Sequence, residues 1–355
     1  MRTRTIAALL AAALFAGGCG PQFDPASKVQ SLRVFAVQKS EPYGKAGAIE
    51  HLTMLWDDPR GSVSPADITW FAGCNNPDGD LYYNCFKQLS TAPALTSDCD
   101  VEFKSFGGND FCFKIPDSII TSHAPSKDPT REPYGVSYVF FAACNGTLGP
   151  APAGQQFPAA CFDKTGKQLG SDDFVAGYTA IYSYAGYDNL NPVIQGVSFN
   201  GQELTRINQG GPCVDPDPQN PAPGQQLDCQ SPAPKPTIAC DSTEKAIPCI
   251  PACPGDGDSS CPEYAIKPVL PHSPTVNQED DPVSGLKEQM WIRYYADGGK
   301  LKSQVRLLND ATTGWNSDYG TTFRAPKKKG PMHIWAVVQD NRGGASWVRV
   351  TIVVQ

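Results

Sequence analysis

Alternating apolar and polar positions dominate the C-terminal end of the chain. Every second residue of 332–338 and of 347–354 is apolar, which is the period of two typical of a half-buried strand. The apolar positions are Met332, Ile334, Ala336 and Val338, then Val348, Val350, Ile352 and Val354. Residues 340–344 between them read Asp-Asn-Arg-Gly-Gly, a turn cluster whose glycines can take positive φ. The pattern predicts a β-hairpin.

Similar patterns predict strands along the rest of the chain. Residues 288–308 predict a second hairpin that turns at 297–299, and residues 191–204 predict a strand with Val193, Val197 and Phe199 on one side. The first half adds five expected strands, at 28–37, 48–58, 68–74, 134–144 and 174–184. Helical periodicity is not evident, and residues 117–123 would form one or two turns.

Strands separated by turn clusters predict an all-β fold of packed sandwiches. A length of 355 residues allows about two domains. Residues 75–133, 145–173 and 207–263 carry cysteines and little periodicity, so we expect them to be insertions. The last of these is rich in proline and poor in apolar residues, which predicts a disulfide-bonded insertion and not a third domain.

The N-terminal residues have the pattern of an export signal. Arg2 and Arg4 precede an unbroken apolar run at 6–15, which is about half the length needed to span a bilayer. A basic start, a short apolar run and small residues before a cleavage point are typical of a secretory signal peptide, here residues 1–18.

Residues 16–19, Ala-Gly-Gly-Cys, resemble the lipobox of bacterial lipoproteins. The resemblance implies cleavage before Cys19 and acylation of Cys19, although Ala16 stands where the family usually has leucine. Three acyl chains would anchor the protein to a lipid bilayer in effect permanently. Gly20, in place of aspartate, implies export to the outer membrane, and residues 19–27 would form a lipidated tether. The alternative is an ordinary signal peptide with an incidental cysteine.

The other twelve cysteines predict disulfides, because even numbers of cysteines in an exported chain are typical of a disulfide framework. They fall into two groups of six: Cys74, Cys85, Cys99, Cys112, Cys144 and Cys161, then Cys213, Cys229, Cys240, Cys249, Cys253 and Cys261. A structural zinc site is the alternative, but the CxxC pair of zinc ribbons is missing. Spacing does not fix connectivity; local pairs are our guess, namely Cys74–Cys85, Cys144–Cys161 and Cys253–Cys261.

The final hairpin, IWAVVQDNRGGASWVRVTIVV, is similar to the last two strands of bacterial immunoglobulin-like or PKD-like domains. The segment from LRVFAVQKSEPYGK to ITWFAGC is similar to the first strands of such domains. The whole layout resembles uncharacterised two-domain lipoproteins of predatory and soil delta-proteobacteria, the myxobacteria among them. The resemblance implies two immunoglobulin-like β-sandwiches, at 28–188 and 189–355, and a surface-displayed, non-catalytic protein.

Catalytic and metal-binding motifs are not evident. The four histidines, His51, His123, His272 and His333, have neither HxxxH nor HExxH spacing, and no GxSxG motif occurs. We therefore name no catalytic residue and no cofactor. Asp256, Asp258 and Glu263 are calcium candidates, because they place oxygen ligands close together, although Asp-Gly clusters form turns first.

Aromatic residues could form a sugar-binding platform, because flat rings stack on the apolar faces of sugars. Most tryptophans fall on expected strands, where they would serve as core. Trp315 lies in a polar loop with Tyr319 nearby, so this pair is our candidate for ligand contact. The net charge of −7 makes nucleic acid an unsuitable partner.

These observations predict an outer-membrane lipoprotein, facing the periplasm or the cell surface. Its expected role is binding or structural, with an envelope protein, a polysaccharide or another cell as partner. The alternative is an exported hydrolase of glycans or cell wall, or its accessory subunit. A cleft lined by paired carboxylates would favour the hydrolase, and a continuous apolar patch would favour partner binding.

Overall fold

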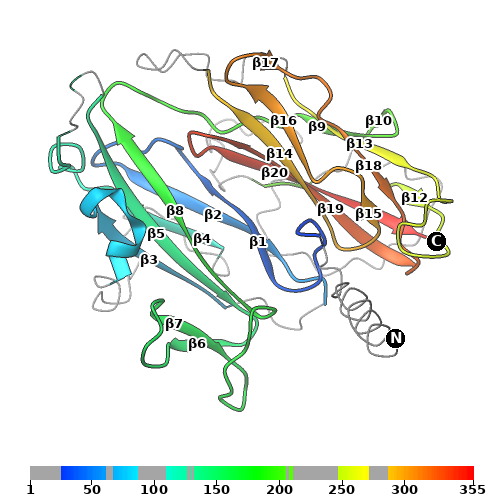
Figure 1. Ribbon diagram of the computed structural model, residues 1–355, viewed down its shortest axis with the longest axis horizontal. Coiled ribbons are helices and arrows are strands. Elements are labelled where there is room, and N and C mark those ends of the chain that lie inside the picture. The colour runs from blue at the N-terminus through cyan, green and yellow to red at the C-terminus, as the bar shows by residue number, and fades with distance from the viewer. Residues whose placement is uncertain are drawn as a thin grey trace, which may run out of the picture.

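The computed structural model describes residues 25–60, 67–86, 109–125, 129, 132–204, 208–210, 247–271 and 287–355. Strands make up about half of these residues, and they form two groups of sheets that lie side by side (Figure 1). We call strands β1–β8 the N-terminal sandwich and strands β9–β20 the C-terminal sandwich. In the described ranges, no helix is long and apolar enough to cross a membrane.

The N-terminal sandwich packs two three-stranded antiparallel sheets against each other. One sheet has the order β1 (Arg33–Lys39), β2 (Ile49–Asp57) and β4 (Asp110–Lys114). The other has the order β3 (Asp67–Asn75), β5 (Tyr134–Cys144) and β8 (Phe174–Tyr184). Leu52 and Trp56 of the first sheet share one buried core with Trp70, Val139 and Phe141 of the second. Burial of these apolar side chains holds the two sheets together.

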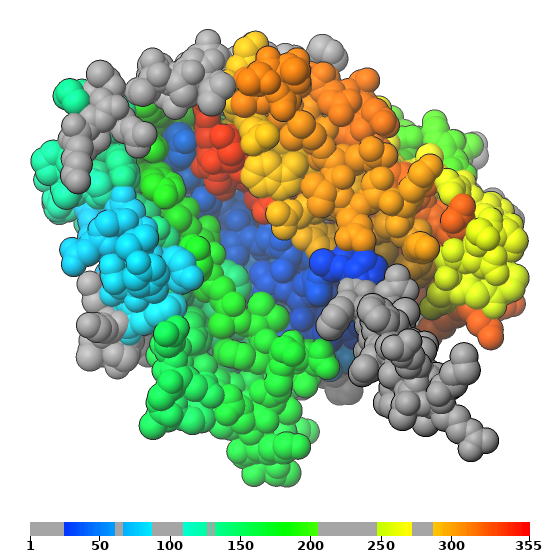
Figure 2. All heavy atoms as spheres, in the orientation of Figure 1, coloured from blue at the N-terminus to red at the C-terminus, as the bar shows by residue number. Residues whose placement is uncertain are grey.

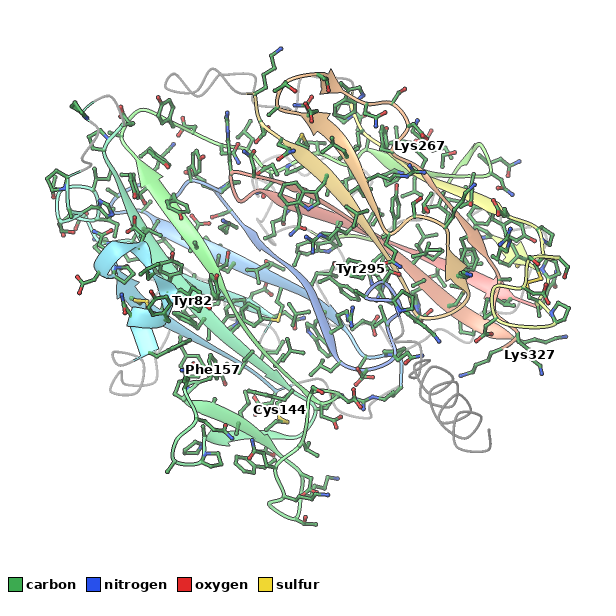
Figure 3. The ribbon with its side chains drawn as sticks, viewed as in Figure 1. Tyr82, Cys144, Phe157, Lys267, Tyr295 and Lys327 are labelled. Atoms are coloured by element: carbon green, nitrogen blue, oxygen red, sulfur yellow. A yellow bond between two sulfur atoms is a disulfide. The ribbon has the colours of Figure 1, made fainter. Side chains whose placement is uncertain are left out.

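Loops on this sandwich carry short elements and disulfides. A loop after β3 contains two 3-10 helices, η1 (Asp78–Asp80) and η2 (Tyr82–Cys85), and the Cys74–Cys85 disulfide closes it. A small hairpin of β6 (Thr147–Pro150) and β7 (Ala159–Phe162) projects below the sheets, with the Cys144–Cys161 disulfide at its base (Figures 1 and 3).

The C-terminal sandwich packs a five-stranded sheet on a larger sheet. The five-stranded sheet has the order β10 (Gln202–Glu203), β9 (Gly196–Phe199), β13 (Tyr264–Val269), β18 (Thr321–Arg324) and β15 (Lys300–Leu301). The larger sheet has the order β11 (Asn208–Gly210), β20 (Ala345–Val354), β19 (Gly330–Asp340), β14 (Met290–Ala296), β16 (Val305–Asp310) and β17 (Gly314–Trp315), with β12 (Cys249–Ile250) parallel to β20. Ile266 and Phe323 meet Ile292, Ile334 and Val350 in the core between these sheets.

A separate apolar cluster joins the two sandwiches. We call it the interdomain core; its buried members are Val29, Phe35, Ala36, Trp335, Val337, Ala345 and Trp347. Phe35 of β1 stacks on Trp335 of β19 with 4.9 Å between ring centroids. The β19–β20 hairpin is therefore buried on both faces, by its own sandwich on one side and by the N-terminal sandwich on the other.

The strand content and the face-to-face antiparallel sheets confirm the predicted fold class, all-β with immunoglobulin-like β-sandwiches and disulfide-bonded loops. The strands predicted at 134–144 and 174–184 have those bounds in the structure. The last hairpin forms as expected. The other pairs β14 with β16 and places Met290, Ile292 and Tyr294 in the core, but its connection is longer than the predicted turn at 297–299, because β15 (Lys300–Leu301) pairs with β18 instead. The limits of the two domains remain a prediction.

Several expected strands need correction. The strand expected at 28–37 begins at Arg33 and ends at Lys39. Residues 191–204 do not form one strand but split into β9 and β10, and Val193 is 48% exposed instead of lying beside buried Val197. Strands β4, β13 and β18 were not expected from the sequence; they are short, and Pro268 within β13 argues against a strand.

The three guessed local disulfides, Cys74–Cys85, Cys144–Cys161 and Cys253–Cys261, are present in the structure. Cys112 and Cys249 are also disulfide-bonded. The remaining predicted disulfide cysteines, Cys99, Cys213, Cys229 and Cys240, lie outside the described residues, as do the signal peptide, Cys19 and most of the tether and of the 207–263 insertion.

Candidate functional site

A cleft of about 1130 Å³ lies between the two sandwiches. Strands β1 and β8 supply one side, and β14 with the turn between β19 and β20 supplies the other. Figure 2 shows this hollow between the side chains of β8 in green and the orange and red C-terminal strands, with those of β1 in blue at its floor. This volume lies slightly above the range of about 300–1,000 Å³ that is typical of ligand pockets in proteins.

Tyrosines are the most frequent side chains in the cleft wall. Six of them line it: Tyr43, Tyr134, Tyr178, Tyr182, Tyr184 and Tyr187. Three come from β8, where alternate residues share a face of the strand. Tyr184 packs on Tyr43 with 4.9 Å between ring centroids and on Tyr187 with 5.6 Å. At the other end of the β8 tyrosines, the Tyr178 ring stacks on the ring of Tyr82, in the disulfide-closed loop, with 4.3 Å between ring centroids.

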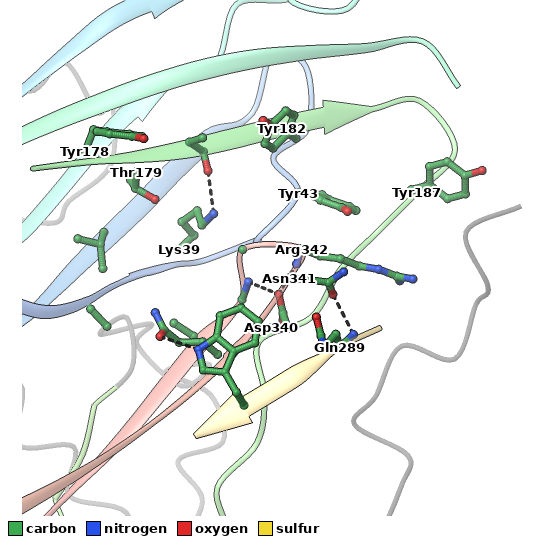
Figure 4. A pocket seen from close by; sticks show the side chains of 18 of the residues that line it. Lys39, Tyr43, Tyr178, Thr179, Tyr182, Tyr187, Gln289, Asp340, Asn341 and Arg342 are labelled. Carbon is green, nitrogen blue, oxygen red and sulfur yellow. Dashed lines mark hydrogen bonds between the residues drawn. The ribbon is translucent and has the colours of Figure 1, made fainter. Parts of the chain in front are cut away.

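The opposite wall is the turn between β19 and β20, which side-chain hydrogen bonds hold in one shape (Figure 4). The buried Asp340 carboxylate accepts the backbone N–H of Arg342 at 2.8 Å and that of Gly344 at 2.7 Å. Asn341 Oδ1 accepts the backbone N–H of Gln289 at 3.0 Å. Gly343 has a φ of 94°, a conformation that glycine adopts without strain. The turn thus presents fixed polar groups to the cleft.

Lys39 lies between the two walls (Figure 4). Its side chain is buried, and Nζ donates a hydrogen bond to the carbonyl oxygen of Ala180 on β8 at 2.9 Å. A Cβ added to Gly343 would come within 2.4 Å of Nζ, so the turn needs glycine at this approach. Burial lowers the pKa of Lys39 to about 8, while the charges of Asp340 and Glu50 act in the opposite direction.

Hydrogen bonds also tie the sandwiches together beside the cleft. Gln38 Nε2 donates to the carbonyl oxygen of Ala345 at 2.6 Å. The Asn191 side chain bridges both parts, since its Nδ2 donates to the carbonyl oxygen of Lys39 at 2.7 Å and its Oδ1 accepts the N–H of Ala345 at 3.0 Å. Together with the interdomain core, these bonds fix the spacing of the cleft walls.

Glu50 on β2 adds a buried carboxylate behind the cleft. Its Oε1 accepts hydrogen bonds from Ser40 Oγ at 2.8 Å and from the backbone N–H of Glu41 at 3.1 Å. Burial raises the pKa of Glu50 to about 7, although these hydrogen bonds and the Lys39 charge act in the opposite direction.

Glu50→Gln should remove a pH-dependent part of the stability. The folded-state pKa of about 7 lies above the ordinary value of 4.5, so this group's contribution is present below pH 4.5 and is lost as the pH rises through 7. Glutamine keeps the accepting oxygen, so the variant should gain on the order of 2 kcal/mol over wild type at pH 8 and little at pH 4. Denaturant midpoints at several pH values measure this, with the exposed Glu41→Gln as control. Parallel profiles for wild type and Glu50→Gln would contradict the assignment.

The calcium candidates Asp256, Asp258 and Glu263 form hydrogen bonds or an ion pair with other residues of the chain. Asp258 Oδ1 accepts both the N–H and the Oγ–H of Ser260, and Asp256 accepts the N–H of Lys327 at 2.8 Å. Glu263 pairs with Arg324 at 2.5 Å. Among the described residues, no group of three or more His, Cys, Asp or Glu side chains could hold a metal ion. These contacts fit the alternative interpretation, in which Asp256, Asp258 and Glu263 stabilise the local turn and its surroundings.

The expected ligand contact at Trp315 and Tyr319 is not supported. Tyr319 is only 6% exposed and belongs to the core of the C-terminal sandwich, and half-buried Trp315 packs against the same core. The Trp315 ring meets the Tyr319 ring edge-on, at 5.8 Å between centroids. The loop that carries Trp315 and Tyr319 is polar in sequence, but both aromatic rings pack toward the core. His333, one of the four histidines, is buried, and its Nδ1 lies 3.0 Å from Asp297 Oδ2.

The sequence did indicate the tyrosines of β8 but not their role. The alternation of Tyr178, Tyr182 and Tyr184 predicts a strand, and a row of tyrosines on one face is also a signal of a contact surface. Lys39, Asp340 and Tyr43 carry no such signal, because they reach the cleft only through long-range packing.

Comparisons with known proteins do not assign the chain to a family. No family model matches the chain, and no curated protein matches it. One similar solved structure is that of the fibronectin(III)-like modules of CbhA from Clostridium thermocellum, with a TM-score of 0.19, 8% identity, and coverage of 90% of this chain and 94% of that one. Another is the D00-D0 domain of intimin, with a TM-score of 0.18, 10% identity, and coverage of 89% and 99%. These TM-scores carry no argument about function, so the site is interpreted from its own geometry.

Proposed function

We propose that this protein is an outer-membrane lipoprotein of the cell envelope that acts as a non-catalytic binding module, with the cleft between the sandwiches as its binding site. One observation carries the proposal: a tyrosine-lined cleft of about 1130 Å³ whose walls are joined by buried apolar packing and hydrogen bonds. Tyrosine combines a large apolar ring with a polar hydroxyl, which suits it to recognition surfaces.

The anchoring part of the proposal rests on the sequence. The apolar run at 6–15 and Ala-Gly-Gly-Cys at 16–19 support acylation at Cys19. Eight of the described cysteines are disulfide-bonded, among them the pairs Cys74–Cys85 and Cys144–Cys161, which fits an oxidising compartment. Labelling with a palmitate analogue should mark the wild-type chain and not the Cys19→Ser variant.

The alternative, an exported hydrolase of glycans or cell wall or its accessory subunit, would need two carboxylates free to act on a glycosidic bond. Glu132, Asp188 and Asp340 are the acidic residues that line the cleft. Asp340 accepts three hydrogen bonds, from Arg342, Gly344 and Asn189, which hold it in the turn. Because the most buried of the three carboxylates holds the turn in shape and is not free to act on a substrate, the cleft favours binding over hydrolysis.

Cross-linking and affinity capture from intact cells, with the anchor in place, test the proposal. We expect one stoichiometric envelope partner with the wild-type chain and its loss in Tyr182→Ala, which removes a ring from the middle of the cleft wall. Lys327→Ala is the matched control, because Lys327 is exposed on the C-terminal sandwich and points away from the body of the protein (Figure 3). Capture that is equal in all three proteins, or glycan hydrolysis that requires Asp188 or Glu132, would contradict the proposal.

A further inference from the structure

Strand β8 is an edge strand whose outer edge faces the cleft. On one side it pairs with β5 over its whole length; on the other side, among the described residues, it has only an isolated bridge from Tyr43 to Tyr182. Near its end, Tyr182 O accepts the N–H of Gly44 at 2.9 Å, and Ala180 O accepts Lys39 Nζ at 2.9 Å. Because backbone groups of alternate residues point to the same edge, the even-numbered residues of β8 direct their N–H and C=O groups to the edge opposite β5, along which Tyr178, Ala180 and Tyr182 line the cleft.

The edge is open further along the strand. Ala176 and Tyr178 have the same orientation as Ala180 and Tyr182, and among the described residues no hydrogen bond reaches their backbone N–H or C=O. Ala176 is exposed, and Tyr178 is 45% exposed. Unpaired backbone groups on a strand edge are a template for another strand.

The sequence of β8 does not protect this edge. Proteins usually protect open edges with charged residues, proline or a covering segment. Residues 174–184, FVAGYTAIYSY, contain neither charged residues nor proline, and they are rich in strand-forming residues. An unguarded edge inside a ligand-sized cleft is therefore a pairing site that remains available.

The ring packing argues against a sugar as the occupant. A sugar ring stacks flat on the face of an aromatic ring. One face of Tyr178 is covered by Tyr82, at an interplanar angle of 19°, and Tyr184 is surrounded by Tyr43, Tyr134 and Tyr187. Other rings therefore pack on Tyr178 and around Tyr184, which favours the side chains of an extended peptide over a flat sugar ring.

We propose that the cleft receives an extended peptide segment of a partner protein, which adds to β8 as a strand through the backbone groups of Ala176 and Tyr178. This inference rests on the binding role proposed above and specifies the ligand. Alternate side chains of the peptide would lie beside Ala176 and Tyr178 on one face. On the other face they would lie beside Gly177, which cannot carry a Cβ because the Phe141 ring is 2.5 Å from that position. The partner segment should therefore alternate aromatic or β-branched residues.

A proline at position 176 tests the backbone contact directly. Ala176→Pro removes an N–H that points to the outer edge of β8 and leaves the bonds to β5 in place, since an edge strand tolerates proline on its solvent side. Ala176→Ser keeps the N–H and is the matched control. The probe is a phage-displayed random peptide library, panned on the purified full chain. We expect enriched peptides with the alternating pattern, a loss of affinity of about tenfold or more with Ala176→Pro, and no loss with Ala176→Ser.

Hydrogen exchange in the wild-type chain gives a second readout that does not depend on the folding of a variant. The amide protons of Ala176 and Tyr178 should exchange more slowly when an enriched peptide is bound. Unchanged exchange at both amides, equal affinity for Ala176→Pro and Ala176→Ser, or a library that yields no peptide with the alternating pattern would overturn strand addition. Intact-cell capture that is lost in Tyr182→Ala but retained in Ala176→Pro would refute strand addition and leave the binding role standing. Capture that survives both changes would refute both proposals.

Discussion

Replacing Trp335 with alanine should destabilise the protein by about 4 kcal/mol and loosen the two sandwiches from each other. Trp335 is 1% exposed, and it stacks on Phe35 across the junction at 4.9 Å between ring centroids. Removing the indole leaves a cavity that neighbouring side chains on two rigid sheets cannot fill. Because Trp335 belongs to the interdomain core and not to the core of its own sandwich, the loss falls on the contact between sandwiches.

Denaturation followed by far-UV circular dichroism measures this effect. Wild type should unfold in one transition, and Trp335→Ala should unfold at lower denaturant concentration, with the two sandwiches separating into two transitions. Trp315→Ala is the matched control, since Trp315 is half-buried and packs only at the border of the C-terminal core. If Trp335→Ala unfolds at the same denaturant concentration as Trp315→Ala, the interdomain core does not join the sandwiches.

Asp340→Ala should also destabilise the protein strongly, again by about 4 kcal/mol. The Asp340 carboxylate is buried, and it accepts the N–H groups of Arg342 and Gly344 and a side-chain N–H of Asn189. Its charge also acts on buried Lys39, raising the pKa of that amine against the effect of burial. Alanine leaves these donors without an acceptor and lets the pKa of Lys39 fall below about 8.

Asp340→Asn separates the two effects. Asparagine keeps Oδ1, the oxygen that accepts the N–H groups of Arg342 and Gly344, but it removes the charge beside Lys39. Its stability should therefore lie between those of wild type and Asp340→Ala in the same denaturation series. Asp340→Ala with the stability of Asp340→Asn would show that the turn does not need this acceptor.

Periodicity predicted the strands well where one face is apolar. Val348, Val350 and Ile352 alternate with other residues, and each of them lies in the core of the C-terminal sandwich. The same pattern did not reveal that β19 and β20 are buried on both faces. Trp335 and Trp347 were expected in a core, but which core they join depends on a second sandwich that alternation within one strand does not describe.

The cleft could not be predicted from the sequence, because it depends on how distant segments pack. Lys39, Tyr178 and Asp340 are far apart in the chain, and they line one cavity only after β1, β8 and the β19–β20 turn have been placed. The candidate contact at Trp315 and Tyr319 failed for a related reason. Polar neighbours suggested exposure, whereas the tertiary fold turns Tyr319 inward. The disulfides between cysteines close in sequence were easier to predict, because forming them does not depend on how distant segments pack.

A photoreactive amino acid at position 179 tests most directly whether the cleft is the binding site. Thr179 lines the cleft on β8, whereas Val305, 57% exposed on β16, serves as the surface control. Irradiation of intact cells that carry the anchored chain should link position 179 to one envelope protein, through an extended peptide segment, and should leave position 305 without that product. The same product from both positions, or none from position 179, would contradict the assignment of the cleft as the binding site.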